Sequence, residues 1–270
     1  MSLTLSLHTS PEVPVEADVL CHDRLNNLNE SALPALTVFH GNEQVALGDF
    51  FKVQGNYNGE LRIEGDLSKV KHIGSGMTGG KLTVIGDVGA HLGAGMSGGE
   101  IVIEGNTADW VASEMTGGRI IIKGNAGHML GSSIRGSATG NTGGEIIVHG
   151  NVGNEAGQAM RNGLIVIGGN SEDLTGVNML SGTIIVLGKM AIRNGAGMKR
   201  GSIISMHGAE EMLSTFTYAC TYNPTYTRLY LEYIRDFGLQ VDDAQLTGNY
   251  ERWVGDSIEL NRGEILIYKN

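Results

Sequence analysis

The chain has 270 residues, a formal net charge of −10 at pH 7, 41% hydrophobic residues, and 42 glycines against 4 prolines. This length and hydrophobic content exclude a disordered chain and allow a substantial core in one or two domains. The negative charge argues against general nucleic-acid binding. Two cysteines cannot form a disulfide framework, and we recognise neither a signal peptide nor a membrane-spanning apolar run, so we expect a soluble, cytoplasmic protein.

Residues 1–55 precede a repeated pattern and are predicted to form a lead-in or cap. The segment Leu3–Leu7 alternates apolar and polar residues as a strand does, and residues 35–39 and 50–53 read as further strands. An open end of stacked strands exposes unpaired backbone, so we expect this lead-in to cover the first repeat.

Residues 56–208 contain one short phrase eight times: a glycine, apolar residues at alternate positions, and usually a second glycine. The leading glycines are Gly59, Gly80, Gly99, Gly118, Gly144, Gly163, Gly182 and Gly201. Most are 19 residues apart, a period typical of a solenoid. Each apolar run is too short for a helix and rich in Ile and Val, which indicates one strand per repeat. We predict an all-β fold, a parallel β-helix of about eight 19-residue coils, with an insertion between Gly131 and Gly144 that bulges as a loop.

Equivalent positions of the repeats form columns, and the apolar ones are predicted to point inward. Two places after the leading glycine the column reads Leu61, Leu82, Ile101, Ile120, Ile146, Ile165, Ile184 and Ile203. Three places before it stand Met77, Met96, Met115, Met160, Met179 and Met198, interrupted by Asn141. Flexible methionines suit an irregular corner of a core.

The outward columns carry charge and an apolar stripe. Directly after the leading glycine the charge alternates along Glu60, Lys81, Glu100, Arg119 and Glu145, which favours one register between neighbouring coils. Two places further on lie six outward apolar residues that we predict to form an interface: Val102, Ile121, Ile147, Val166, Ile185 and Ile204. Something must cover this stripe, either the C-terminal segment or a partner protein.

Residues 209–270 differ in kind and are predicted to form a C-terminal cap. A helix is expected at about 224–237, between Pro224 and Gly238, with one face made of Tyr226, Tyr230, Tyr233, Ile234 and Phe237. The segment 262–268 echoes a repeat strand and is expected to pair back onto the coils.

A stretch from 174 to 209 contains no acidic residue in an otherwise acidic protein. It carries four cations, Lys189, Arg193, Lys199 and Arg200. The simple interpretation is a solvated end of the solenoid. The sharper hypothesis is a contact for an anionic partner surface or an anionic cofactor tail.

Motifs that suggest catalysis or ligand binding lack the context they require. GSGMTG at 74–79 and GAGMSG at 93–98 match a dinucleotide fingerprint, but no helix follows them. His72 and His91 are equivalent positions, yet no metal-ligand spacing accompanies them. We find no catalytic triad and no pair of carboxylates on a groove, so we predict no catalytic and no metal-binding residues.

Several segments together resemble the C subunit of formylmethanofuran dehydrogenase, above all the form in the formyltransferase/hydrolase complex of methylotrophic bacteria. They are VPVEADVL at 13–20, HGN at 40–42, LGDFF at 47–51, the GAGMSGG-type coils, and GGEIIVHGN at 143–151. The coil motif alone also resembles the β-helical domain of the glutamate synthase large subunit. The resemblance implies a right-handed β-helix.

The resemblance also implies a function, formaldehyde oxidation in one-carbon metabolism. Such a C subunit would assemble with an amidohydrolase-like A subunit that releases formate, with a B subunit, and with a D subunit that transfers formyl from formyl-tetrahydromethanopterin to a methanofuran-type carrier. The chemistry is assigned to those chains, so this chain is expected to be a non-catalytic scaffold. Three alternatives stay open: the C subunit of a tungsten or molybdenum dehydrogenase, a glutamate synthase-like module, and a free-standing carbohydrate-active β-helix.

Overall fold

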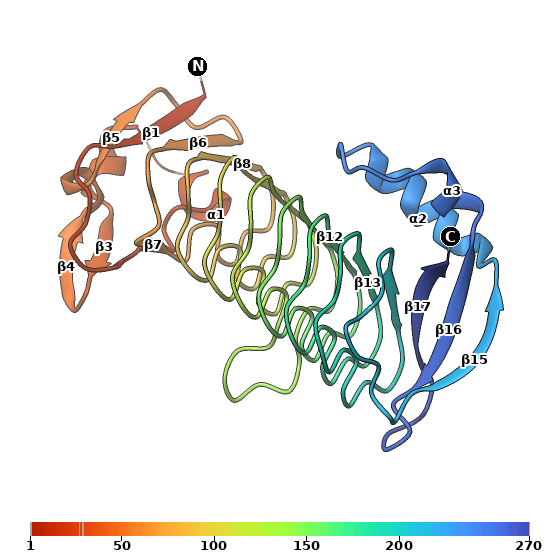
Figure 1. Ribbon diagram of the computed structural model, residues 1–270. Coiled ribbons are helices and arrows are strands. Elements are labelled where there is room, and N and C mark those ends of the chain that lie inside the picture. The colour runs from red at the N-terminus through yellow and green to blue at the C-terminus, as the bar shows by residue number, and fades with distance from the viewer. Residues whose placement is uncertain (1, 27, 29, 270) are drawn as a thin grey trace.

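The computed structural model describes residues 2–26, 28 and 30–269, and within them the fold is mostly β, with one large mixed sheet and no closed barrel (Figure 1). The large sheet has 13 strands in the order β15 (Thr217–Tyr222), β16 (Asn249–Gly255), β17 (Gly263–Lys269), β14 (Ser202–Ser205), β13 (Thr183–Val186), β12 (Leu164–Ile167), β11 (Glu145–Val148), β10 (Arg119–Ile122), β9 (Glu100–Ile103), β8 (Lys81–Ile85), β6 (Glu60–Glu64), β1 (Leu3–Leu7) and β5 (Phe51–Gln54). A second sheet has four strands, β4 (Glu43–Ala46), β3 (Thr37–His40), β2 (Val15–Glu16) and β7 (Val70–Lys71).

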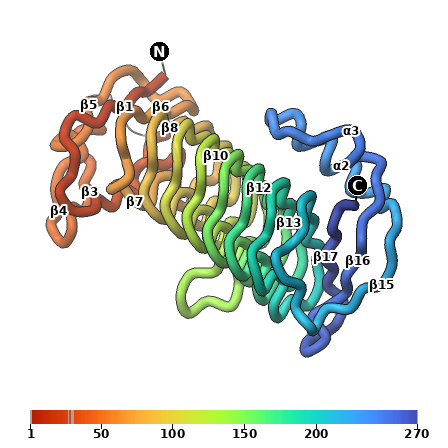
Figure 2. Tube along the Cα trace, in the orientation of Figure 1, coloured from red at the N-terminus to blue at the C-terminus, as the bar shows by residue number. Residues whose placement is uncertain are grey.

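Successive repeats lie directly over one another. Strands β6 and β8 to β14 pair in parallel, and Ile120 is in register with Ile101 on one side and Ile146 on the other. A second ladder of single-residue parallel bridges runs from Leu67 to Ala209 through the equivalent residue of each repeat. Each period therefore makes one turn of the chain, and the turns stack along one axis (Figures 1 and 2).

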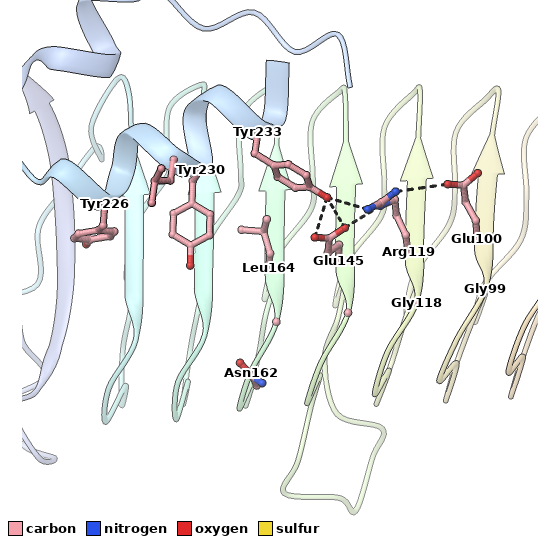
Figure 3. A pocket seen from close by; sticks show the side chains of 13 residues that line it. Gly99, Glu100, Gly118, Arg119, Glu145, Asn162, Leu164, Tyr226, Tyr230 and Tyr233 are labelled. Atoms are coloured by element: carbon pink, nitrogen blue, oxygen red, sulfur yellow. Dashed lines mark hydrogen bonds and ion pairs between the residues drawn. The ribbon is translucent and has the colours of Figure 1, made fainter. Parts of the chain in front are cut away.

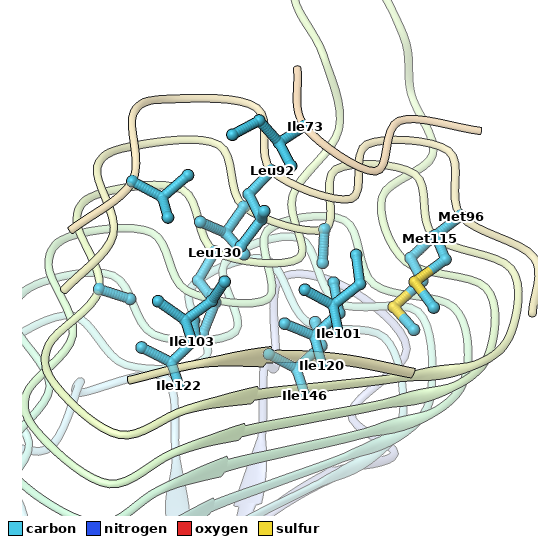
Figure 4. Close-up of a cluster of buried hydrophobic side chains, with 14 of the residues drawn as sticks. Ile73, Leu92, Met96, Ile101, Ile103, Met115, Ile120, Ile122, Leu130 and Ile146 are labelled. Carbon is cyan, nitrogen blue, oxygen red and sulfur yellow. The ribbon is translucent and has the colours of Figure 1, made fainter. Parts of the chain in front are cut away.

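The predicted inward columns form the core of the stack. Ile101, Ile120 and Ile146 are fully buried, and Figure 4 shows them packed one behind another inside the coils. All six methionines of the predicted column are at most 1% exposed. Asn141, which interrupts that column beside the insertion, is fully buried, and its Nδ2 has no hydrogen-bond partner in the described chain.

A column of Asx residues follows the strands and joins neighbouring coils. Residues of this type tolerate positive φ, and the sequence places them at corners, but it is the leading glycines that adopt it, such as Gly118 with φ 85°. The Asx side chains instead join coils: Asn125 Oδ1 accepts the Asn151 N–H at 2.8 Å, and Asn151 Oδ1 accepts the Asn170 N–H at 2.7 Å. We call Asp87, Asn106, Asn125, Asn151 and Asn170 the Asx column.

The lead-in lies against the first coil. Strand β1 pairs in parallel with β6, and β5 pairs antiparallel with β1. The predicted strand at 35–39 is shifted to β3, and three short helical turns were not foreseen: α1 (His22–Leu25) and the 3₁₀ segments η1 (Glu30–Ala35) and η2 (Leu47–Asp49). Asp23 of α1 fixes this segment to the coils, because its carboxylate accepts from the Thr78 N–H and hydroxyl at 2.9 and 2.6 Å.

The C-terminal segment extends the sheet and then covers part of it. Strand β17 pairs in parallel with β14, as its echo of the repeat predicts, and β16 and β15 continue antiparallel. The predicted helix is α2 (Thr225–Arg235), and a second, unpredicted helix is α3 (Asp243–Thr247). In Figure 1 both helices lie over the outer side of the last coils. Their position determines which part of the outer sheet surface stays exposed.

Candidate functional site

The outward apolar stripe is largely covered by the chain itself, which corrects its prediction as a partner interface. Ile147, Val166, Ile185 and Ile204 are fully buried and share a second apolar cluster with Leu231 and Ile234 of α2. A partner protein therefore cannot contact these four side chains. Their cover is the C-terminal segment, because α2 places its apolar face directly on the strands.

The stripe is less completely covered at its N-terminal end. Val102 on β9 is half-buried, and Ile121 on β10 is 8% exposed. Neither belongs to the apolar cluster under α2. An interface role at these two positions stays a prediction.

An open groove of about 1100 Å³ lies between α2 and the beginnings of β9 to β12. Its coil side is formed by Gly99, Glu100, Gly118, Arg119, Gly144, Glu145, Asn162, Gly163 and Leu164. Its helix side is formed by Tyr226, Leu229, Tyr230 and Tyr233. Figure 3 shows the three tyrosines in a row along the helix, each turned toward the strands.

A charged cluster closes one end of the groove. The Tyr233 hydroxyl lies 2.8 Å from Glu145 Oε2 and 2.9 Å from Arg119 Nη2, while Arg119 Nε donates to Glu145 Oε2 at 2.8 Å. Burial, and then the hydrogen bond to Glu145, raise the pKa of the Tyr233 hydroxyl, and the bond to Glu145 raises the pKa of Arg119. Figure 3 shows this network continuing to Glu100, whose Oε2 lies 3.7 Å from Arg119 Nη1.

A second cluster holds the other end of α2. The Glu264 carboxylate on β17 accepts from Ser202 at 2.7 Å, from Tyr226 at 2.8 Å and from Arg252 Nε at 2.7 Å. Burial raises the pKa of Glu264, but these three hydrogen bonds together outweigh it and leave the pKa below its ordinary value. Burial and the nearby carboxylate raise the pKa of Tyr226 well above its usual range.

The alternating charge column is confirmed from Lys81 to Glu145, and it supplies the groove's charged wall. Lys81 Nζ lies 2.9 Å from Glu100 Oε1, and Arg119 lies between Glu100 and Glu145. The sequence pointed to the tyrosine face and to this charge column separately. It did not show that they meet, because the hydrogen-bonded Tyr233 and Glu145 are 88 residues apart.

The four predicted cations come from different parts of one coil. Lys189 follows β13, Arg193 lies in a later turn with φ 61°, and Lys199 and Arg200 lead into β14, so they occupy different places around the coil. Lys199 Nζ also lies 3.7 Å from the carboxylate of Glu259, which comes from outside the acid-free stretch 174–209. Binding of an anionic partner or cofactor tail by these residues stays a prediction.

The equivalent residues His72 and His91 form an aromatic stack with Trp110. His72 and His91 lie with ring centroids 4.7 Å apart, and His91 stacks on Trp110 at 5.5 Å. Among the described residues no group of three His, Cys, Asp or Glu side chains is placed to hold a metal ion. In the same part of the chain, no helix combines the length and apolar content needed to cross a membrane.

Comparison with known proteins gives two kinds of relative, although no family model matches. Over 80 residues the chain is 43% identical to the C subunit of the molybdenum-containing formylmethanofuran dehydrogenase 1 of Methanothermobacter thermautotrophicus, a match that covers 29% of this chain and 20% of the relative. Over 91 residues it is 40% identical to the C subunit of the tungsten-containing formylmethanofuran dehydrogenase 2 of the same organism, a match that covers 32% and 34%. The chain thus matches about a third or less of these relatives' length.

The likeness to a solved structure is more extensive. A chain in the crystal structure of the formyltransferase/hydrolase complex of Methylorubrum extorquens, in complex with methylofuran, superposes with a TM-score of 0.92 and 28% identity over 99% of this chain and 100% of that chain. The fold is a stack of β strands with an open groove beside α2, and the chain it superposes on belongs to a multi-subunit complex. The matched segments and the superposition together support the family of formylmethanofuran dehydrogenase C subunits.

Proposed function

We propose that this chain is a non-catalytic structural component of a complex that transfers formyl from formyl-tetrahydromethanopterin to a methanofuran-type carrier and hydrolyses it to formate. The observation that carries the proposal is the near-complete superposition on a chain of the formyltransferase/hydrolase complex, with a TM-score of 0.92. Function resides in specific surfaces. Likeness over a whole chain includes the surfaces that meet other subunits, so it supports a shared place in an assembly better than a local motif does.

The scaffold role rests on the architecture. We propose that the stacked coils are a right-handed parallel β-helix at 56–208, between an N-terminal cap at 1–55 and a C-terminal cap at 209–270. In-register stacking of Ile101, Ile120 and Ile146 supports this assignment. The charged side chains of the groove are engaged with one another, which supports a role in holding surfaces rather than in moving protons.

The partners in this proposal are an amidohydrolase-like A subunit, a B subunit and a formyltransferase D subunit. The carrier would be handled by the whole complex, in line with the methylofuran present in the structure of the neighbour. This chain would contribute no catalytic residue and bind no catalytic cofactor of its own.

A second candidate is the C subunit of a molybdenum or tungsten formylmethanofuran dehydrogenase, favoured by the 40–43% identity of short segments to such chains. The formyltransferase/hydrolase form is preferred because it matches the chain over its whole length. Metal analysis of the purified complex separates the two: molybdenum or tungsten indicates the dehydrogenase.

The experiment that tests the proposal is affinity purification of the tagged full chain from its native extract, followed by mass spectrometric identification of the partners. The proposal predicts an amidohydrolase-like and a formyltransferase-like chain in equal amounts with the bait. Recovery of a glutaminase-bearing chain would support the glutamate synthase-like alternative instead. Recovery of the bait alone would contradict assembly.

A further inference from the structure

The groove under α2 is too large and too open to be explained as packing space. Its volume of about 1100 Å³ exceeds the roughly 300–1,000 Å³ of pockets that enclose drug-sized ligands. It extends across the beginnings of four consecutive strands, which at a strand spacing of about 4.8 Å makes it about 14 Å long. These dimensions suit a segment of polypeptide better than a small molecule.

The charges of the groove are already matched within this chain. Arg119 is shared by Glu145 and Glu100, and Glu100 is also paired with Lys81 at 2.9 Å. Beyond the groove, near Tyr226 at the other end of α2, Glu264 is likewise paired, with Arg252 Nε at 2.7 Å. A charged occupant would have to compete with these pairs, so charge complementarity favours an uncharged one.

The middle of the groove offers apolar and aromatic surface. Leu229 is 69% exposed although it projects from the helix that covers the sheet, and Leu164 lies on the coil side. The Tyr230 hydroxyl has no hydrogen-bond partner among the described residues, in contrast to the hydroxyls of Tyr226 and Tyr233. Figure 3 shows Tyr230 pointing toward the coil side, between its two anchored neighbours. Clustered tyrosines with an exposed leucine are typical of protein interfaces.

The groove floor also has hydrogen-bonding groups to offer. In the described part of the chain, the N–H groups of Gly99, Gly118, Gly144 and Gly163 donate to no protein acceptor, although all four residues line the groove. Their carbonyls, in contrast, are used between coils: Arg119 N, for example, donates to the Gly99 carbonyl at 3.0 Å. The main-chain carbonyls of a bound segment are acceptors that match such donors.

We propose that this groove docks an uncharged segment of a partner protein in the complex, with an apolar side chain seated between Tyr230 and Leu164 and main-chain carbonyls facing the glycine floor. The inference rests on the proposed function, because it requires that the chain assembles with other subunits. It assigns the contact to a surface outside the covered stripe, formed jointly by the coils and the C-terminal helix.

The test introduces charge from each wall of the groove without touching buried groups. Leu229→Glu acts from the helix side and Asn162→Arg from the coil side, and both wild-type side chains are exposed. Each variant is purified as the tagged full chain under the same conditions as the wild type. Recovery of the partner should be about tenfold lower than with the wild-type chain, as expected at an interface centre. Unchanged thermal unfolding midpoints would show that the fold is retained.

A matched control is Ile258→Glu, an apolar residue that is 77% exposed and does not line the groove. Partner recovery should stay at the wild-type level. Equal recovery for Leu229→Glu, Asn162→Arg and wild type would overturn the inference and leave the proposed function intact. A loss of partner recovery with Ile258→Glu as large as with the groove variants would also overturn it. So would the finding that the isolated chain is a dimer that Leu229→Glu dissociates, because the groove would then bind a second copy of this chain. If wild-type chain recovers no partner, the proposed function itself fails.

Discussion

Tyr233 of helix α2 donates its hydroxyl to the Glu145 carboxylate of strand β11, at 2.8 Å from Oε2, and so ties the C-terminal segment to the middle of the coil stack. Glu145 in turn accepts a hydrogen bond from Arg119 on the neighbouring strand β10. The charge column that favours the coil register thus also holds the helix that covers the apolar stripe.

Removal of that hydroxyl should loosen the helix. Tyr233→Phe keeps the ring and loses hydrogen bonds to a carboxylate and a guanidinium, so we expect the free energy of unfolding in urea to fall by about 1–2 kcal/mol. Tyr230→Phe is the control on the same helix, because its hydroxyl has no protein partner in the described chain and its loss should cost almost nothing. Equal effects of the two changes would show that the Tyr233 bonds do not stabilise the fold.

The covered stripe predicts opposite results at two equivalent positions. Ile185 is fully buried under the C-terminal segment, so Ile185→Asp should destabilise the fold by about 3 kcal/mol or more. Val102 is half-buried beyond the apolar cluster, and Val102→Asp should leave a folded chain. Circular dichroism during thermal unfolding measures both. A stable Ile185→Asp chain would mean that α2 does not cover the stripe.

The Asx column predicts a dependence on a side-chain acceptor. Asn151→Ala leaves the Asn170 N–H without its partner and should cost about 1 kcal/mol in the free energy of unfolding. Asn151→Asp keeps an acceptor at this position and should recover most of the loss. If Asn151→Asp is as unstable as Asn151→Ala, then the hydrogen bond is not what the column contributes.

The Glu264 cluster predicts a loss of stability in acid. Because the pKa of Glu264 is lower in the folded chain than in the unfolded chain, its contribution is present above the unfolded pKa of about 4.3–4.5 and is lost as pH falls through the folded pKa. The difference in unfolding free energy between pH 6 and pH 3 should therefore be smaller for Glu264→Gln than for wild type. Parallel pH profiles in urea titrations would contradict the assigned pKa direction.

The sequence predicts those features of the fold that repeat. A 19-residue period requires that Ile120 lies over its equivalents in the neighbouring coils, and the methionine column follows from the same spacing, so the repeat alone is enough to place these positions. Alternating charges predicted the contacts of Arg119 with Glu100 and Glu145 for the same reason. Equivalent residues one period apart become neighbours whatever the rest of the chain does.

Features that join distant segments could not be predicted in this way. The sequence shows that the stripe needs cover, but a partner protein and the C-terminal segment would both provide it. Only the structure, which packs Leu231 and Ile234 against the stripe, distinguishes between the two. Helix α3 did leave a local signal, the capping box of Asp242 and Gln245, which its five-residue length made easy to overlook. The groove left no signal, because its two walls come from unrelated patterns.

The most direct test of the account compares formate release from the formylated carrier by the isolated chain and by the purified complex that contains it. We predict turnover by the complex and none by the isolated, folded chain, because the role proposed for this chain is to hold other subunits in place. Formate release by the isolated chain would contradict the central claim that this stack of coils is a scaffold.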